Sequence, residues 1–335
     1  MIGGEFPITF EAIQDAEAPK HAREYYVYSS GRAALYQILK YLRVKQDIGK
    51  ILLPDYLCSS VMMPVKELGL NYAFYPLNES LQLRQDAFPL LYSNDSAVLL
   101  INYYGLQDLS EQIGFIRSID PKAVIIEDDV QAYFEFKKDL GGADFKFTSL
   151  RKTFPIPDGG LVKTQHTLPM IHERNTFGQY KAAAGLMKSI RTGNFDDKVY
   201  LNISEDAEKM IDHEVDKGIS MIAEKLYANV DESFVKERRI RNAKYLVSEM
   251  DRIGLKPLLP LQDEKVPLFV PVLLPNRNKV RSSMFGHDVF CPVHWPLDGL
   301  DVKKGKEMAE LELSLVVDQR YDEKDMDTIV HLLKG

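Results

Sequence analysis

The sequence predicts an α/β fold built on a mainly parallel sheet, followed by a smaller α+β region. Segments with the character of strands and helices alternate through the first half of the chain, which is the pattern of α/β domains. Residues 97–101 and 123–126 are continuous apolar runs, typical of parallel strands that are covered on both faces. Ligands of such sheets bind beyond the carboxyl ends of the strands, so we expect the functional side chains there.

Length and composition are those of an ordinary globular protein with two domains. The chain has 335 residues, of which 45% are hydrophobic and 27% are charged, so it can bury a large core. We expect a large domain over residues 1–230 and a small domain over residues 231–335. The N-terminal sequence has neither the basic nor the apolar region of a signal peptide, and we therefore expect a cytoplasmic protein.

Charge and cysteine content argue against several classes of function. The net charge is −7 and the isoelectric point is about 5.6, so a basic surface for nucleic acid is not expected. Cys58 and Cys291 are the only cysteines, too few for a disulfide framework or a metal site of the Cys-x-x-Cys type. No apolar run approaches the ~20 residues of a membrane-spanning helix. We expect no nucleic-acid, membrane or metal partner.

The first strand and helix contain a candidate phosphate site. Residues 1–25 are expected to be irregular or to form a short helix, and residues 24–42 to form a short strand, a turn and an amphipathic helix. The apolar face of this helix consists of Leu35, Ile38, Leu39 and Leu42. Ser29 or Ser30 can cap the helix, and Gly31 lets the backbone approach a ligand. Such a helix start suits a phosphate, although a plain capped helix explains the same residues.

The next elements continue the alternation. We expect strands over residues 51–54, 72–75, 97–102 and 123–129, and helices over residues 55–67 and 109–118. Tyr103 and Asp128 lie at or near the ends of two of these strands. An aspartate in this position commonly caps a helix or stabilises a turn. Alternatively, its carboxylate faces a cationic ring nitrogen, stays ionised and keeps that nitrogen protonated.

One segment places a lysine on short, stiff backbone. Phe145 and Phe147 alternate with polar residues, which predicts a half-buried strand. After Lys152, Pro155 and Pro157 exclude a helix, and an Asp-Gly-Gly turn leads into another strand. Most lysines are solvated surface charges. A lysine that forms a Schiff base must be held against one carbonyl carbon and be partly desolvated to lose its proton, and this segment suits that role.

The second half of the chain is expected to contain mainly packing helices and a small domain. Residues 177–230 are predicted to form core helices, and residues 232–253 one long helix. Residues 256–335 alternate short strands and helices. His294 follows a predicted strand and either lines a substrate pocket or has a structural role. Arg320 either binds a substrate carboxylate or forms a surface ion pair.

Four motifs in the same order resemble those of the fold type I aminotransferases that depend on pyridoxal 5'-phosphate (PLP), and more narrowly the DegT/DnrJ/EryC1/StrS group of sugar aminotransferases. Residues 127–132, Glu-Asp-Asp-Val-Gln-Ala, are similar to the group's Glu-Asp-Ala-Ala-Gln-Ala. Residues 31–35, Gly-Arg-Ala-Ala-Leu, resemble its Gly-Thr-Ala-Ala-Leu helix start. Residues 149–161 carry a serine, a lysine and a Gly-Gly-Leu in the group's order, and residues 292–294 and 313–321 resemble its endings.

The resemblance spans about residues 25–334 and implies an aspartate aminotransferase-like fold with PLP as cofactor. It implies that Lys152 forms the Schiff base and moves a proton, that Asp128 keeps the pyridine nitrogen protonated, and that Gln131 contacts the region of the ring hydroxyl. The implied phosphate-binding residues are Ser30, Gly31, Arg32 and Ser149. We expect contacts to the substrate from Tyr103, His294 and Arg320. A homodimer is expected from the group alone.

The chain departs from the group's pattern around the cofactor. The group stacks an aromatic ring on the cofactor from the helix after the second strand, where this chain has Cys58, with Tyr56 two residues earlier. We expect either Tyr56 or Cys58 to face the ring. The group's serine lies five residues before the lysine, whereas Ser149 lies three before it, so Thr148 is a second candidate for that role. The group's Gly-x-Asn-x-Arg motif, which reaches the neighbouring subunit's phosphate, is not found.

We therefore expect an aminotransferase that moves an amino group from a donor such as glutamate to a keto substrate, here a nucleotide-linked keto sugar, through a Schiff base of Lys152. Two alternatives stay open. One is a PLP-dependent lyase or decarboxylase on the same fold, and the other is a non-catalytic regulatory protein that binds PLP. Lys152 argues against the sugar dehydratases of this fold, which usually lack the lysine.

Overall fold

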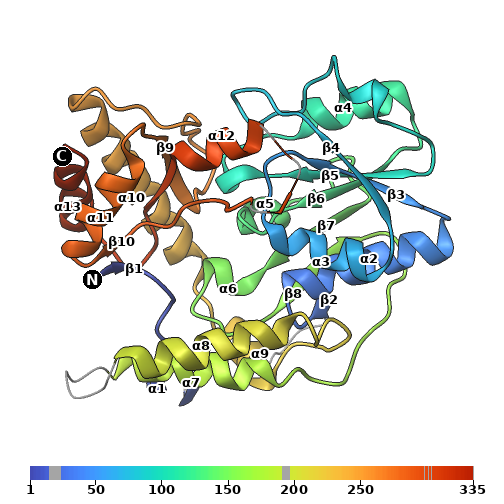
Figure 1. Cartoon of the computed structure of the whole chain (residues 1–335). Coiled ribbons are helices and arrows are strands. Elements are labelled where there is room, and N and C mark those ends of the chain that lie inside the picture. Colours follow the sequence, from blue (N-terminus) through green and yellow to red (C-terminus); the bar gives the residue numbers. More distant parts are fainter. Residues whose placement is uncertain (15–23, 191–196, 298, 301, 303, 335) are drawn as a thin grey trace.

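A sheet of seven strands forms the centre of the molecule in the computed structural model, which describes residues 1–14, 24–190, 197–297, 299–300, 302 and 304–334. The strands are β2 (Tyr26–Tyr28), β3 (Lys50–Pro54), β4 (Asn71–Tyr75), β5 (Ser96–Ile101), β6 (Val124–Asp128), β7 (Phe145–Ser149) and β8 (Gly160–Thr164). Their order is β2-β8-β7-β6-β5-β3-β4 (Figure 1). The strands from β7 to β4 are parallel, and β8 is antiparallel to both neighbours. The predicted α/β class with a mainly parallel sheet is confirmed.

Helices connect and cover these strands. They are α2 (Gly31–Lys45), η1 (Ser59–Val61), α3 (Met62–Glu67), η2 (Phe88–Leu90), η3 (Tyr103–Gly105), α4 (Ser110–Ile119), α5 (Tyr133–Phe136) and α6 (Leu150–Thr153). The predicted apolar face of α2 is buried where the helix packs on β7 and β8. Ser30 caps α2, because its hydroxyl accepts a hydrogen bond from the Ala33 N–H at 3.1 Å. The start of this helix is therefore fixed beside the edge of the sheet.

Strand β7 differs from its prediction, because it is buried on both faces. The amine of Lys146 lies 3.1 Å from a Glu127 carboxylate oxygen and 3.4 Å from one of Asp129. Lys146 also donates a hydrogen bond to the Glu135 carbonyl at 2.9 Å. These contacts satisfy a charge on the side of the strand that the alternation had assigned to solvent. A pattern of alternating polar residues cannot distinguish solvent from a buried ion pair.

Three helices from the middle of the chain lie together below the sheet in Figure 1: α7 (Phe177–Ser189), α8 (Asp197–Ile211) and α9 (Met221–Ala228). They confirm the helices predicted between residues 177 and 230, as far as that range is described. Ser220 caps α9 and donates a hydrogen bond to the buried Asp158. Asp158 also accepts hydrogen bonds from the Ser220 N–H at 2.8 Å and the Asn175 amide at 2.9 Å. The Asp-Gly-Gly turn is thereby tied to this helical layer.

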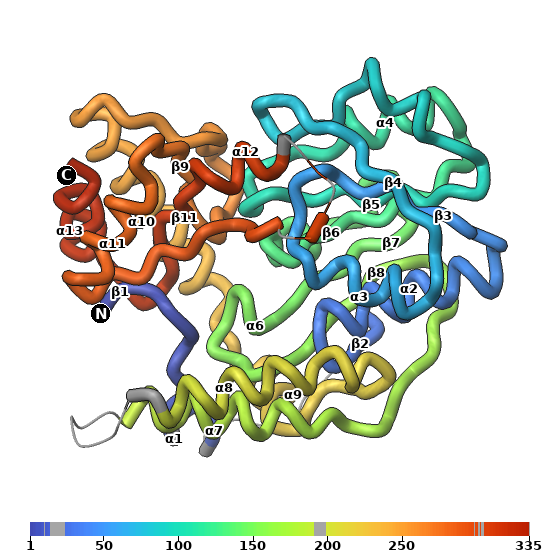
Figure 2. The backbone as a smooth tube through the Cα atoms, in the orientation of Figure 1, coloured from blue at the N-terminus to red at the C-terminus, as the bar shows by residue number. Residues whose placement is uncertain are grey.

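The C-terminal region has its own core. Its elements are α10 (Glu232–Arg252), β9 (Phe269–Leu273), α11 (Arg277–Gly286), β10 (Val289–Phe290), α12 (Lys304–Leu311), β11 (Glu312–Val316) and α13 (Glu323–Leu333). Strands β9 and β11 are antiparallel. Strand β1 (Ile2–Gly3) pairs with β10, so the N-terminus lies beside this region (Figure 2). The prediction for residues 1–25 missed that strand, although it included the short helix α1 (Phe10–Gln14). We propose that the small domain begins near residue 231 and includes β1.

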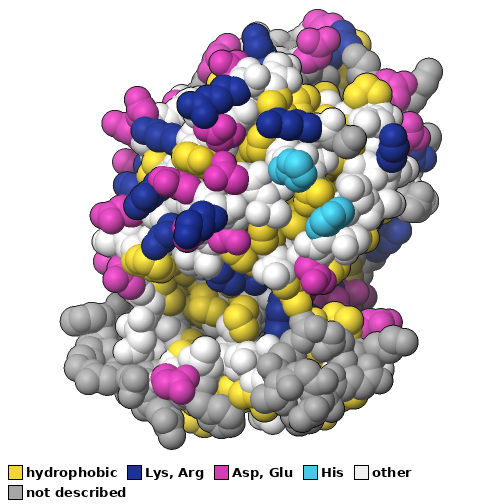
Figure 3. Space-filling view, turned by 90° about the vertical axis from the view of Figure 1, so that its left-hand side faces the viewer, with side chains coloured by type: hydrophobic (Ala, Val, Ile, Leu, Met, Phe, Trp, Pro, Cys, Tyr) yellow, Lys and Arg dark blue, Asp and Glu magenta, His cyan; other side chains and the backbone are white. Residues whose placement is uncertain are grey.

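The surface of the C-terminal region carries charges of both signs. On the face shown in Figure 3, Lys and Arg side chains are interspersed with Asp and Glu. Among the described helices, none combines the length and the apolar character needed to cross a membrane. The described residues also contain no group of three or more His, Cys, Asp or Glu side chains arranged to hold a metal ion.

Candidate active site

A cavity of about 580 Å³ opens at the carboxyl ends of β5, β6 and β7, where the sheet faces the C-terminal region. Its size is within the range of small-molecule sites, roughly 300–1,000 Å³. Ten of the twelve predicted site residues line it: Ser30, Gly31, Arg32, Cys58, Asp128, Gln131, Ser149, Lys152, His294 and Arg320. The strand-end rule predicted that Ser30, Asp128 and Lys152 would converge, and the cavity brings these three together. The other cavity residues of this set were predicted from the family resemblance.

Lys152 lies on the single helical turn α6, which is fixed at both ends. The Leu150 N–H donates to the Gly159 carbonyl at 3.0 Å, and the Gly159 N–H donates to the Ser29 carbonyl at 2.8 Å. Gly159 has a φ of +110°, which an L side chain rarely adopts. A Cβ on Gly160 would lie 2.0 Å from the Ser30 carbonyl oxygen. Both glycines are thus required to bring the lysine turn against the start of α2.

The carbonyl of the residue after Lys152 is held from the C-terminal region. Gln319 donates a hydrogen bond to the Thr153 carbonyl at 2.9 Å, and Arg239 of α10 donates one at 3.3 Å. Arg239 is buried and also donates to the Leu268 carbonyl at 3.0 Å. Burial lowers the pKa of Arg239 to about 10. The lysine turn is therefore connected to both halves of the molecule.

The environment of Lys152 lowers the pKa of its amine. Its side chain reaches the open space of the cavity, and no described residue accepts a hydrogen bond from its amine. The positive charge of Arg151 and then burial lower the pKa of Lys152, while Cys58, Glu5 and Glu208 oppose this effect. A lysine near another cation loses its proton more readily than an isolated lysine and is then a nucleophile.

Asp128 ends β6 and faces the same cavity. Its carboxylate accepts a hydrogen bond from the Val130 N–H at 2.9 Å, and no described cation contacts it. Burial raises the pKa of Asp128 to about 7; the Val130 hydrogen bond opposes that shift and the charge of Glu127 adds to it. A cationic group in the cavity would restore the ionised carboxylate. The alternative role considered for Asp128, stabilising a turn, is also observed, because its side chain accepts the hydrogen bond from the Val130 N–H two residues later.

Arg32 lies at the start of α2, but its charge is engaged by helix α8. Its guanidinium contacts Glu208 and Asp212, each at 2.6 Å. Glu208 also contacts Arg151 at 2.9 Å and Lys181 at 3.0 Å. Burial raises the pKa of Glu208, but the charges of Arg151, Lys181 and Arg32 outweigh this and hold that pKa well below its ordinary value. One carboxylate is thus surrounded by three cations.

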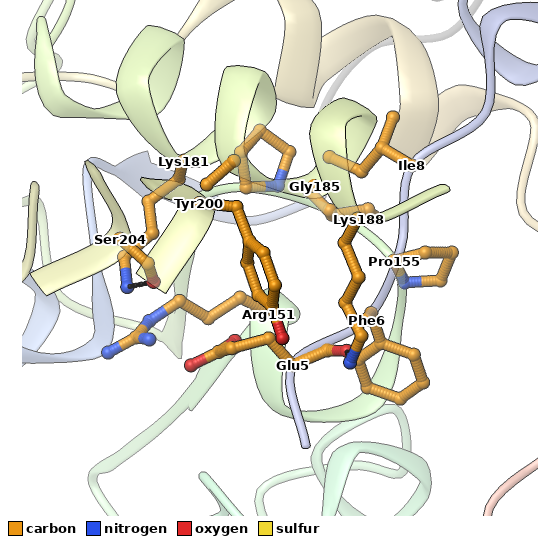
Figure 4. Close-up of a pocket in the computed structure, with 13 residues that line it drawn as sticks. Glu5, Phe6, Ile8, Arg151, Pro155, Lys181, Gly185, Lys188, Tyr200 and Ser204 are labelled. Atoms are coloured by element: carbon orange, nitrogen blue, oxygen red, sulfur yellow. Dashed lines mark hydrogen bonds between the residues drawn. The ribbon is translucent and has the colours of Figure 1, made fainter. Parts of the chain in front are cut away.

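A small pocket of about 30 Å³ adjoins this cluster and shares Glu5, Phe6 and Arg151 with the main cavity. Figure 4 shows the Tyr200 hydroxyl and the Lys188 amine pointing toward Glu5. Lys188 donates a hydrogen bond to the Glu5 carbonyl, and Lys181 donates one to the Ser204 hydroxyl at 2.9 Å. No local pattern indicates this cluster, because its members come from distant parts of the chain.

The remaining predicted cofactor-binding residues differ in how many of their polar atoms are available to a ligand. The Gln131 side-chain oxygen accepts a hydrogen bond from the Tyr104 N–H at 2.9 Å, which orients the amide and leaves its nitrogen free to donate to a ligand. Ser149 lies against Gly31, where an added Cβ would come within 3.2 Å of the serine Cβ. Thr148 donates to the Asp129 carbonyl at 2.7 Å and does not line the cavity. Of the two candidates, Ser149 therefore faces the site.

Tyr56 and Tyr103 are the two predicted site residues that do not line the cavity. Both are buried, and their rings stack at 5.8 Å with an angle of 22° between them. The Tyr56 hydroxyl donates to the His294 carbonyl, and the Tyr103 hydroxyl donates to the Tyr56 carbonyl. Cys58 lines the cavity in place of an aromatic ring. The two tyrosines support the cavity wall from behind, which corrects their predicted positions at the ligand.

Arg320 lines the cavity, yet its guanidinium is already occupied. It contacts both carboxylate oxygens of Asp318, at 2.9 and 2.7 Å, and the carbonyls of Gly4 and Glu5 at 3.2 and 3.1 Å. A substrate carboxylate would have to compete with Asp318. Its predicted role in binding the amino donor stays a prediction, and the ion pair that we considered as the alternative is present.

Sequence reasoning missed several cavity residues. Glu5 and Phe6 were placed in an irregular segment, and Arg151, Glu208, Arg239 and Asp318 were not selected. Arg151 directly precedes Lys152 and could have been found by asking which charge would lower the lysine pKa. The contribution of Glu208 from α8 depends on a contact between distant segments, which no local pattern contains.

Comparison with known proteins gives the fold. Neither a family model nor a curated protein matches the chain. Many solved structures do. Among them are the sugar aminotransferase CalS13 from Micromonospora echinospora (TM-score 0.70, 13% identity, 100% of this chain and 99% of that chain), the aminotransferase TlmJ from Streptoalloteichus hindustanus (0.71, 15%, 100% and 98%), and NtdA from Bacillus subtilis with bound cofactor PMP (0.62, 16%, 94% and 74%). The chain has the fold of the PLP-dependent aminotransferases. The fold implied by the sequence resemblance is thereby confirmed over nearly the whole chain.

Proposed function

We propose that this chain is a PLP-dependent aminotransferase that acts on a keto sugar. The observation that carries the proposal is the presence of Lys152 and Asp128 in one cavity at the ends of β6 and β7, with electrostatics that suit complementary roles. The charge of Arg151 lowers the pKa of Lys152, which makes its amine a better nucleophile near neutral pH. Asp128 is a buried carboxylate that a cation would stabilise.

The residues of the cavity fit PLP. The cavity is large enough, the amine of Lys152 is available for a covalent bond, and Asp128 has no cation among the described residues. Ser30, Gly31, Arg32 and Ser149 would hold the phosphate beside the start of α2. When bound, PLP supplies an electron sink that stabilises negative charge on a substrate carbon. The tight contact of Gly31 with Ser149 and Val130 favours a glycine where a ligand approaches the backbone.

The chain's own residues would handle the protons. The Nζ of Lys152, once free, would accept a proton from the substrate carbon and return it elsewhere in the cavity. The carboxylate of Asp128 would keep the ring nitrogen protonated. Cys58 and Gln131 would contact the ring and its hydroxyl region. The apolar rings of Trp295 and Phe269, which also line the cavity, would limit access of water to the ligand.

The finer parts of the proposal are glutamate as the amino donor, a nucleotide-linked keto sugar as the acceptor, and a cytoplasmic homodimer. The fold shared with two proteins named as sugar aminotransferase and aminotransferase supports the choice of substrate class. The proposed homodimer rests on the sequence resemblance alone.

The test is amino transfer by the purified protein with PLP, glutamate and a panel of nucleotide-linked keto sugars, followed as 2-oxoglutarate and amino sugar. We expect stoichiometric formation of both products, loss of both in Lys152→Ala, and no change in the exposed control Lys256→Ala. Release of carbon dioxide or ammonia without an amino sugar would instead favour a lyase or decarboxylase. PLP binding with no turnover of any substrate would favour a regulatory protein.

A further inference from the structure

A buried chain of hydrogen bonds reaches from β11 to the cavity residue His294. The Nδ1 of His294 lies 2.7 Å from the Ser314 hydroxyl, and that hydroxyl donates to a carboxylate oxygen of Glu312. The other oxygen of Glu312 accepts a hydrogen bond from the His294 backbone N–H at 2.6 Å. Glu312 and Ser314 are fully buried. Glu312 thus holds His294 twice, once at the backbone and once through the ring.

The direction of these bonds fixes the proton on the imidazole. A serine hydroxyl has one hydrogen, and a carboxylate can only accept. Because the Ser314 hydroxyl donates its one hydrogen bond to Glu312, its oxygen can only accept a hydrogen bond from His294. The imidazole must then carry its proton on Nδ1, which leaves Nε2 with a lone pair. The same logic governs histidines whose second nitrogen is oriented by a carboxylate.

The ring is neutral and faces the ligand space. Burial, and then the charge of Lys152, lower the pKa of His294 to about 3. His294 lines the cavity, and no described residue is a hydrogen-bond partner of its Nε2. The rings of Phe269 and Trp295, both in the cavity wall, lie 5.2 and 5.1 Å from the imidazole. This wall therefore combines apolar ring faces with a single neutral acceptor.

We propose that Glu312 and Ser314 are positioning residues that hold His294 as the neutral Nδ1–H tautomer, so that its Nε2 accepts a hydrogen bond from a hydroxyl group of the acceptor substrate. The assignment of the donor as a sugar hydroxyl rests on the proposed function, whereas the tautomer rests on the geometry and on an ionised Glu312. The site then prefers a ring with a hydroxyl at this position over one with a carbonyl or ether oxygen, which would place two acceptors together.

Glutamine in place of Glu312 should reverse the direction of the hydrogen bonds from residue 312 to the His294 ring. The backbone N–H of His294 is a fixed donor, so the glutamine oxygen must face it. The glutamine NH₂ then points to Ser314, whose hydroxyl turns and donates to Nδ1. The proton of the ring moves to Nε2, and the acceptor in the cavity becomes a donor. Ser314→Thr keeps the hydroxyl, whereas Ser314→Ala removes it and leaves the tautomer unfixed.

The experiment is nitrogen NMR of the full-length, PLP-loaded protein labelled with ¹⁵N-histidine, with His294→Asn to assign the ring signals. It is recorded at pH 8, above the pKa of about 7 to which burial raises Glu312. We expect the Nδ1–H tautomer in the wild type and in Ser314→Thr, and the Nε2–H tautomer in Glu312→Gln. Loss of the single tautomer in Ser314→Ala supports the chain even if Glu312→Gln does not fold. A wild-type Nε2–H tautomer, or a tautomer unchanged in both Glu312→Gln and Ser314→Ala, would overturn the inference.

The substrate part is tested with a nucleotide-linked keto sugar that the wild type converts and with its O-methyl analogues, which can accept a hydrogen bond but cannot donate one. We expect one O-methyl analogue to lose about tenfold in kcat/KM in the wild type, as expected for one hydrogen bond to an oriented acceptor. Glu312→Gln should lose this preference, because its Nε2–H can donate to the ether oxygen. Equal preference in the wild type and in Glu312→Gln would contradict the specificity role. A wild type that converts none of the sugars would refute the proposed function and leave the NMR result to decide the tautomer.

Discussion

The buried ion-pair cluster behind the candidate active site gives a prediction with a calculable size. Lys146 on β7 contacts Glu127 and Asp129, which flank Asp128 on β6. All three side chains of the cluster are at most 7% exposed. In Lys146→Met the volume is nearly kept but the cation is lost. Removal of one partner from a buried ion pair costs about 3–5 kcal/mol, because an uncompensated charge is left inside.

The structure also limits that cost and sets its pH dependence. The variant can restore neutrality if the two carboxyl groups take up one additional proton. A carboxyl group with an ordinary pKa near 4 that must be protonated at pH 7 costs about 4 kcal/mol, since each pH unit is worth about 1.4 kcal/mol. The folded variant then binds one more proton than the folded wild type, so its stability relative to the wild type falls as pH rises. The penalty should be about 4 kcal/mol at pH 7 and about 1.5 kcal/mol at pH 5.

The assay is urea unfolding of the PLP-free protein, followed by circular dichroism at pH 5, 6 and 7 for the wild type and Lys146→Met. The matched control is Lys244→Met, which breaks an ion pair of 2.7 Å with Asp263 between side chains that are 52% and 89% exposed. Such an exposed pair contributes less than about 1 kcal/mol. A loss below 1 kcal/mol in Lys146→Met, or a loss that does not depend on pH, would refute the reasoning.

Three further variants address the site itself. Lys152→Ala should lose the visible absorption of covalently bound PLP and at least about 10³-fold in turnover, with an unchanged circular dichroism spectrum; residual turnover near the wild-type rate would contradict the role of the lysine. Asp128→Asn should still bind PLP but turn over about 10²-fold more slowly, and equal rates would remove Asp128 from the mechanism. The same Asp128→Asn change should stabilise the PLP-free protein at pH 8 by about 2–4 kcal/mol. Burial raises the pKa of Asp128 to about 7, so the ionised carboxylate destabilises the folded protein increasingly as pH rises from about 4 to 7. A variant that is less stable in urea would contradict this. Arg151→Gln should raise the pKa of Lys152, since the Arg151 charge is the largest cause of its lowering. Covalent binding of PLP should then require a higher pH than in the wild type. A spectrophotometric titration in which PLP binds at an unchanged or lower pH would be inconsistent with that.

Local signals in the sequence identified the elements and much of the site. Apolar runs predicted β5 and β6, and the Asp-Gly-Gly turn with its two prolines predicted the short connection that carries Lys152. The convergence of Asp128 and Lys152 followed from a topological rule, because the carboxyl ends of parallel strands share one edge. These predictions needed only short-range patterns and a sheet direction.

The parts that could not be predicted depend on contacts between distant segments. Strand β1 pairs with β10, nearly the full chain length away, and two residues are too few to show a period. Glu208 reaches the cavity from α8, and its distances to Arg32 and Arg151 have no counterpart in local sequence. Tyr56 was chosen by its place in a motif, whereas the side-chain direction that buries it depends on packing against Tyr103 and Trp295.

The most direct test of the central claim is the visible absorption spectrum of the purified protein with PLP, recorded before and after the addition of glutamate. The account predicts a yellow band from PLP bound through Lys152 that converts to the band of the amine form as glutamate gives up its amino group. A band that glutamate leaves unchanged would contradict the proposed donor. The absence of any band with added PLP would contradict the active site itself.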